Sequence, residues 1–201
     1  MNFRNLLLAL AALLALSVWH RAHRPIAHAP GEIAPDVPLQ QALDAPATPW
    51  HDGDYSIKPL ARFSITARVL SRADYRFDRE AGLVPVDLAL GWGRMSDSTV
   101  LDKIDISQSG RFYYWRVNEF PIPEREIIES SANMHLIPGD ASIEREIKRT
   151  RDGDVVEFDG YLVEVDGANG FKWASSLTRS DSGAGACELV WVEHFDIVPG
   201  P

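Results

Sequence analysis

The feature that most constrains the fold is a series of segments in which apolar and polar side chains alternate. In residues 63–69 every second side chain is apolar: Phe63, Ile65, Ala67 and Val69. This alternation predicts a strand with one buried face. The valine-rich residues 155–165 and 188–192 predict further strands, because side chains that branch at Cβ favour extended backbone.

Turn-forming residues indicate how these strands are connected. Gly160 interrupts the strand predicted for residues 155–165 and indicates a bulge or a bend of the kind found in barrels. The pair Asn169-Gly170 is a strong hairpin signal, because both residues adopt positive φ angles easily. The aromatic residues 111–117 (RFYYWRV) have large side chains on both faces, which predicts a strand at the centre of the sheet.

Three short segments carry helix signals. Ser96 or Asp97 is a suitable N-cap for the first and Asp140 for the third, and Pro123 is suitable for the first turn of the second. Helices this short are not stable alone and must pack on the sheet. Together these elements predict one domain over residues 51–199. Its class is mainly β (α+β), a small curled sheet or an OB/SH3-like barrel with two or three short inserted helices.

The N-terminal part of the chain contains an apolar run of 14 residues, residues 6–19. As a helix this run spans about 21 Å, which is less than the bilayer core of about 30 Å. We expect residues 1–24 to be a membrane anchor or a signal segment, and a poor cleavage pattern favours an uncleaved anchor. We then expect the chain to bind the inner membrane through residues 6–19. We place the body in the periplasm rather than the cytoplasm. The prolines of residues 25–50 predict a linker that raises the body from the membrane.

Charge and cysteine content exclude several classes of protein. Residues 30–201 carry 17 basic and 29 acidic side chains, so nucleic acid is not expected to be a partner. The single cysteine, Cys187, excludes an intramolecular disulfide and a CxxCH haem attachment. The cluster His51-Asp52-Gly53-Asp54 is typical of turns, so we predict neither a metal site nor a cofactor.

Several segments together carry a resemblance that covers nearly the whole chain. They are GWGRMSD at 91–97, SANMHLIP at 131–138, GYLV at 160–163, SSLTR at 175–179 and GACE at 185–188, with RPI at 24–26 and AP at 34–35. The chain resembles a group of uncharacterised bacterial proteins with an N-terminal membrane segment. This resemblance implies placement at a membrane. It implies no activity and no active site.

One hypothesis for a site is a cysteine nucleophile. Cys187 follows a glycine-rich run, and His135 lies beside the polar Asn133. A nucleophilic thiol needs a base and a third group to orient that base, so His135 with Asn133, Asp181 or Glu188 could activate Cys187. The alternative is that Cys187 is a small buried hydrophobic residue and His135 a core histidine. A second candidate base, His194, has the pattern of a solvent-facing strand residue.

A second hypothesis is a groove that binds a ligand. Aromatic rings with nearby arginines suit glycans, peptides or the edge of a partner protein. The predicted ligand-binding residues are Trp92, Arg94, Tyr113, Trp115, Arg116 and Arg179. The alternative is that the rings fill the core and the arginines pair with acids. We expect a membrane-anchored, non-catalytic binding or assembly module of the bacterial cell envelope, the alternative being a cysteine hydrolase or transpeptidase acting on envelope peptides through Cys187 and His135.

Overall fold

The computed structural model describes residues 24–45, 47–178 and 187–200. The predicted membrane segment, residues 6–19, lies outside the described residues. Among the residues that are described, the helices are too short or too polar to cross a bilayer. The anchor, the inner-membrane placement and the periplasmic body therefore stay predictions.

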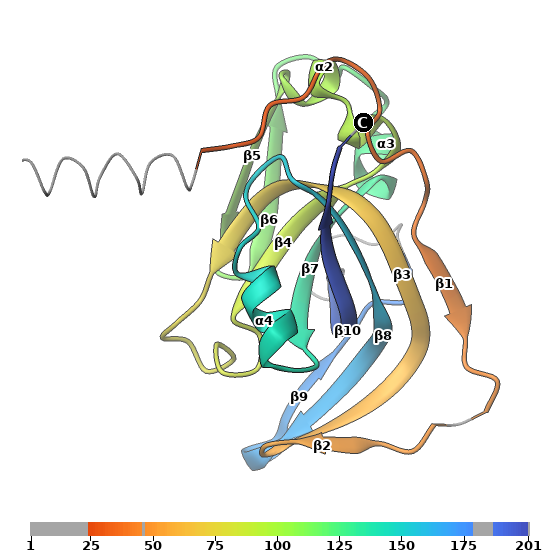
Figure 1. The fold of residues 1–201 in the computed structure, drawn as a ribbon, viewed down its shortest axis with the longest axis vertical. Coiled ribbons are helices and arrows are strands. Elements are labelled where there is room, and N and C mark those ends of the chain that lie inside the picture. Colours follow the sequence, from red (N-terminus) through yellow and green to blue (C-terminus); the bar gives the residue numbers. More distant parts are fainter. Residues whose placement is uncertain (1–23, 46, 179–186, 201) are drawn as a thin grey trace, which may run out of the picture.

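Five strands close into a barrel (Figure 1). They are β3 (Tyr55–Asp74), β4 (Val86–Gly91), β7 (Ser131–Pro138), β8 (Val155–Gly167) and β10 (Glu188–Val198). β3 pairs with β4, β4 with β7, β7 with β10, β10 with β8, and β8 pairs back with β3. The β7–β10 pairing is parallel and the other four are antiparallel. A five-stranded Greek-key barrel is the OB type, which confirms the predicted mainly β class.

Alternating side chains fill the barrel, as the sequence predicts. From β3 the residues Phe63, Ile65, Ala67 and Val69 point into the core, and Val86, Leu88 and Leu90 do so from β4. Phe158 of β8 stacks on Phe195 of β10, with ring centroids 5.6 Å apart. Residues between these positions face outwards, and this outward set includes the site described below.

Gly160 lies at a close approach of β8 and β10. The pairing register shifts between Val192 and His194, opposite this glycine. A Cβ at Gly160 would lie 1.9 Å from the backbone oxygen of Trp191. The predicted bulge is therefore confirmed, and only glycine leaves space for it. The hairpin turn at Asn169-Gly170 is also confirmed, with φ angles of 59° and 74°.

The three predicted helices are present. They are α2 (Ser98–Leu101), α3 (Glu124–Glu129) and α4 (Ala141–Ile147), with the 3-10 turns η1 (Gly93–Ser96) and η2 (Ala168–Gly170). The carboxylate of Asp140 accepts hydrogen bonds from the N–H groups of Ser142 and Ile143, and Asp97 caps α2 in the same way. α4 connects β7 to β8 and packs Ile147 into the barrel core.

The aromatic segment 111–117 does not occupy the centre of the sheet. It forms β6 (Phe112–Val117), which, within the part of the chain that the structure describes, pairs with β5 (Ile104–Ser109) alone, in a separate two-stranded hairpin. One face of β6 is exposed, with Phe112 at 40% and Tyr114 at 52% exposure. The prediction of a central strand was wrong. Large aromatic side chains on both faces suit a hairpin that covers the barrel on one side and meets water on the other.

The proline-rich segment predicted as a linker lies against the barrel. β1 (Leu39–Ala42) and β2 (Trp50–Asp52) both pair with β3. Upstream, the Ile26 N–H donates to the oxygen of Asp152 at 2.8 Å, and Ala34 is buried at 1% exposure. Residues 26–42 are thus part of the folded body in this structure. Proline limits backbone freedom, but it does not prevent a segment from docking.

Candidate functional site

A gap in strand pairing creates the site. Residues Val155–Leu162 of β8 pair with β10, whereas Glu164–Gly167 pair with the short strand β9 (Phe171–Ala174). β9 thus occupies the place beside β8 that β10 does not reach. β10 begins at Glu188, and its Leu189 pairs with His135 of β7. Among the described residues no strand pairs with the outer edge of β9.

A pocket of about 360 Å³ opens at this place. Its lining comes from β9, β7, the tip of the β5–β6 hairpin and the residue before β10. The lining residues are Arg111, Phe112, His135, Lys172, Trp173, Ala174 and Cys187.

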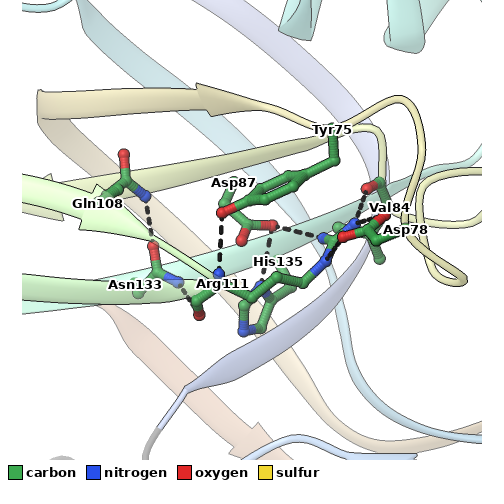
Figure 2. A network of polar contacts seen from close by, with 8 residues as sticks. All are labelled: Tyr75, Asp78, Val84, Asp87, Gln108, Arg111, Asn133 and His135. Carbon is green, nitrogen blue, oxygen red and sulfur yellow. Dashed lines mark hydrogen bonds and ion pairs between the residues drawn. The ribbon is translucent and has the colours of Figure 1, made fainter.

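Arg111 is the centre of the polar network beneath the pocket (Figure 2). Its guanidinium donates to both carboxylate oxygens of Asp78, at 2.8 and 3.0 Å. It also donates to Asp87 Oδ1 at 3.1 Å and to the backbone oxygen of Val84 at 2.9 Å. The same cation lies 3.9 Å from the ring centroid of Tyr75. A guanidinium has five N–H donors in a planar fork, so a lysine here could not replace these bonds.

The backbone of Arg111 is held as firmly as its side chain. Its φ angle is +66°, and Gly110 before it has +58°. A non-glycine residue in this region costs about 1–2 kcal/mol. The Arg111 N–H donates to the Tyr75 hydroxyl at 3.0 Å, and its carbonyl accepts from Asn133 Nδ2 at 3.0 Å. These bonds, with the charged ones of the guanidinium, offset the strain and fix the hairpin tip over the pocket.

Asp87 and His135 are direct cross-strand partners on β4 and β7. Their side chains point out of the barrel but are covered by the hairpin tip and β9, with exposures of 0% and 3%. His135 Nδ1 lies 2.9 Å from Asp87 Oδ1. The imidazole ring lies against Trp173, with centroids 4.6 Å apart. A buried carboxylate next to a histidine nitrogen fixes the orientation of the ring.

The network shifts the pKa of two residues in the loop between β3 and β4. Burial, and then the charge of Asp87, raise the pKa of the Tyr75 hydroxyl, which therefore stays protonated at neutral pH. The hydrogen bonds from Arg111 lower the pKa of Asp78, so this carboxylate stays ionised. The neutral Tyr75 hydroxyl and the ionised Asp78 carboxylate are thus both able to accept their hydrogen bonds from Arg111.

The structure brings the predicted Cys187 and His135 to one pocket, although 51 residues separate them in the sequence. Cys187 is half-buried. Asn133 does not orient His135; its amide donates to Arg111 and accepts from Gln108 Nε2 at 2.6 Å. Asp87 has the orienting position instead. Asp181 lies outside the described residues.

The predicted ligand-binding set does not form one groove. Trp92 is 1% exposed and belongs to the barrel core, so its predicted surface role was wrong. Arg94 pairs with Glu126, with 2.6 Å between Nε and Oε1. Tyr113 donates to Ser131 Oγ at 3.3 Å, Trp115 packs edge-on against Phe120, and Arg116 lies on the exposed face of β6. Arg179 lies outside the described residues.

Sequence reasoning missed Asp87 and Trp173 as members of the site. Asp87 is the one charged residue in the apolar run Val84–Leu90, and a carboxylate in such a run indicates a buried partner. That signal was available. Trp173 carried no comparable signal, because a tryptophan after a hairpin turn is equally suitable for a core.

Comparisons with known proteins find no matching family model, no matching curated protein and no matching solved structure. Among the described residues there is also no group of three or more side chains able to hold a metal ion. The site is therefore interpreted from its own geometry.

Proposed function

We propose that this protein is a binding module of the bacterial cell envelope, tethered by its N-terminus, that captures an extended peptide segment of an envelope partner. The observation that carries the proposal is the pocket beside the edge of β9 with which no strand of the described residues pairs. A peptide in extended conformation can add to such an edge through main-chain hydrogen bonds and place a side chain in the pocket.

The side chains around the pocket support capture of an uncharged group. The positive charge of Arg111 is already shared by Asp78 and Asp87, and Lys172 pairs with Asp166. Arg111 and Lys172, the arginine and the lysine of the lining, are thus both paired with acids. Trp173 and Phe112 provide aromatic surface, which is the common means of holding an apolar or neutral side chain.

The rigidity of the site also favours binding. Arg111 joins the loop between β3 and β4, the hairpin tip and strand β4 through hydrogen bonds from both its backbone and its side chain. A site that is fixed before the ligand arrives loses less entropy when the ligand binds.

Photo-crosslinking in intact membranes tests the proposal. A photoreactive residue replaces Lys172, which is exposed and lines the pocket. A matched control replaces Lys148, an exposed lysine on α4 that also pairs with an acid. We expect a single crosslinked partner peptide from position 172 and none from position 148. Identical products from both positions, or none from 172, would overturn the proposal.

A further inference from the structure

We propose that Cys187 is a nucleophile with His135 as its general base, so that the pocket transfers the acyl group of a peptide or ester bound there. The inference rests on the proposed function for capture of the peptide and adds a reaction to it. The juxtaposition that carries it is a thiol and a buried, carboxylate-oriented imidazole in the lining of one pocket.

The two imidazole nitrogens of His135 have different surroundings. Nδ1 faces Asp87, and the second nitrogen, Nε2, points away from it (Figure 2). Among the described residues no hydrogen bond to Nε2 is formed. Asp87 Oδ1 lies 2.9 Å from Nδ1, and a carboxylate at that side of the ring favours the tautomer that carries its proton on Nδ1 and its lone pair on Nε2. A buried nitrogen with a fixed lone pair beside a pocket is suited to accept a proton.

Asp87 is a positioning residue, because it acts only through His135. Its carboxylate also accepts from Arg111, so Arg111, Asp87 and His135 lie in a row beneath the pocket. This arrangement stabilises an imidazolium as it forms, since Asp87 is buried and close. The ring of Trp173 against His135 excludes water from one side of the imidazole.

Cys187 is placed by the backbone at the start of β10. Its carbonyl accepts from the Ser176 N–H at 3.0 Å, which ties it to the segment after β9. Two residues later, Leu189 pairs with His135 across the parallel β7–β10 ladder. Cys187 as a residue is half-buried and belongs to the lining of the pocket, which places it next to a compound bound there.

The reaction proceeds in two balanced steps. In the first, the Cys187 proton moves to His135 Nε2, the sulfur attacks the acyl carbon, and the bond to the leaving group breaks. The leaving group takes the proton from His135, and a thioester remains on Cys187. In the second, water or an amine loses a proton to His135 and attacks the thioester, which releases the acyl product and restores the thiol.

The test uses the full chain and p-nitrophenyl acetate, which releases a coloured product on acyl transfer. We expect a burst of about one equivalent of p-nitrophenolate per chain and an acetyl group on Cys187 by mass spectrometry. His135→Gln should slow the burst by about 100-fold. Cys187→Ala should abolish it. The matched control is His194→Gln, which removes an exposed histidine that also pairs with an aspartate and should leave the burst unchanged.

A second measurement uses the wild-type chain, so it tests the proposal even if the His135→Gln variant does not fold. The rate of alkylation of the wild-type thiol by iodoacetamide is followed against pH. An activated thiol reaches its full rate well below the usual cysteine pKa of about 8.5, whereas an ordinary thiol follows that value. Absence of a burst together with an ordinary alkylation profile would overturn the proposal.

The experiments distinguish a failure of the capture proposal from a failure of the acyl-transfer proposal. If Cys187→Ala still crosslinks its partner from position 172 while the wild type shows no burst, capture stands and acyl transfer is overturned. If the burst is present and no peptide crosslinks, capture is overturned instead, and the reaction must have a substrate other than an envelope peptide.

Discussion

Among the described residues, two histidine–aspartate pairs occupy equivalent cross-strand positions in opposite environments. His135 and Asp87 are cross-strand partners on β7 and β4, with 2.9 Å between nitrogen and oxygen. His194 and Asp159 are cross-strand partners on β10 and β8, at 3.2 Å. Both pairs point out of the barrel. The His135 side chain is 3% exposed and that of His194 is 76% exposed.

The difference comes from what covers each wall. The β5–β6 hairpin tip and β9 lie over the first pair, while the second pair meets water. In water an ion pair contributes little, because solvent screens it. Under a protein layer the same pair needs a further partner. Arg111 supplies it by donating to Asp87, and Asp78 and Tyr75 in turn accept hydrogen bonds from Arg111. Burial under the hairpin tip and β9, rather than the ion pair itself, thus makes His135 and Asp87 a candidate site.

The largest effect is expected from breaking the covered pair. Asp87→Ala leaves Arg111 and His135 without their shared carboxylate in a buried place. We expect the free energy of unfolding to fall by about 3–5 kcal/mol in urea titrations. The matched change in the exposed pair, Asp159→Ala, should alter it by less than about 1 kcal/mol. Equal losses of unfolding free energy in the two variants would show that burial does not change what a histidine–aspartate pair contributes to stability.

A backbone change is expected to damage the exposed wall more than any change to its charges. Gly160→Ala places a Cβ 1.9 Å from the oxygen of Trp191, so β8 and β10 must separate at the bulge. We expect a loss of about 2–3 kcal/mol in the same titrations. Gly82→Ala is the control, because no atom lies within 4 Å of its added Cβ. A loss at position 160 no larger than at position 82 would contradict the close approach.

The smallest effect concerns the hairpin and appears only at high pH. Burial raises the pKa of Tyr113 to about 12, whereas an unfolded tyrosine has about 10. The folded state therefore holds the phenolic proton more tightly. The resulting stabilisation is complete below pH 10 and is lost as the pH rises towards 12. We expect the free energy of unfolding to fall by about 2 kcal/mol over that interval.

Two tyrosines on opposite faces of β6 provide the comparison. Tyr113→Phe should weaken the alkaline loss, because the buried phenol is removed. Tyr114→Phe should leave it unchanged, since Tyr114 is 52% exposed. If the two variants lose stability equally between pH 10 and 12, the buried face of β6 is not the source of the effect.

Local chemistry made part of this structure predictable. The alternation in residues 63–69, the bulge at Gly160, the turn at Asn169-Gly170 and the cap at Asp140 depend on neighbouring residues alone. The position of residues 111–117 could not be predicted in this way. A strand with two apolar faces is equally consistent with a central strand and with a hairpin that packs on a barrel.

The sequence by itself determined the mainly β class, the short helices and the pairing of Cys187 with His135 as a hypothesis. Only the tertiary structure decided that both residues line one pocket, that Asp87 rather than Asn133 orients the imidazole, and that Trp92 is buried. The reason is physical. Strand and turn signals act over a few residues, whereas a site on the outside of a barrel depends on which distant segment covers it. Here the hairpin tip precedes β7 in the sequence and β9 follows it, and both cover the site on β7.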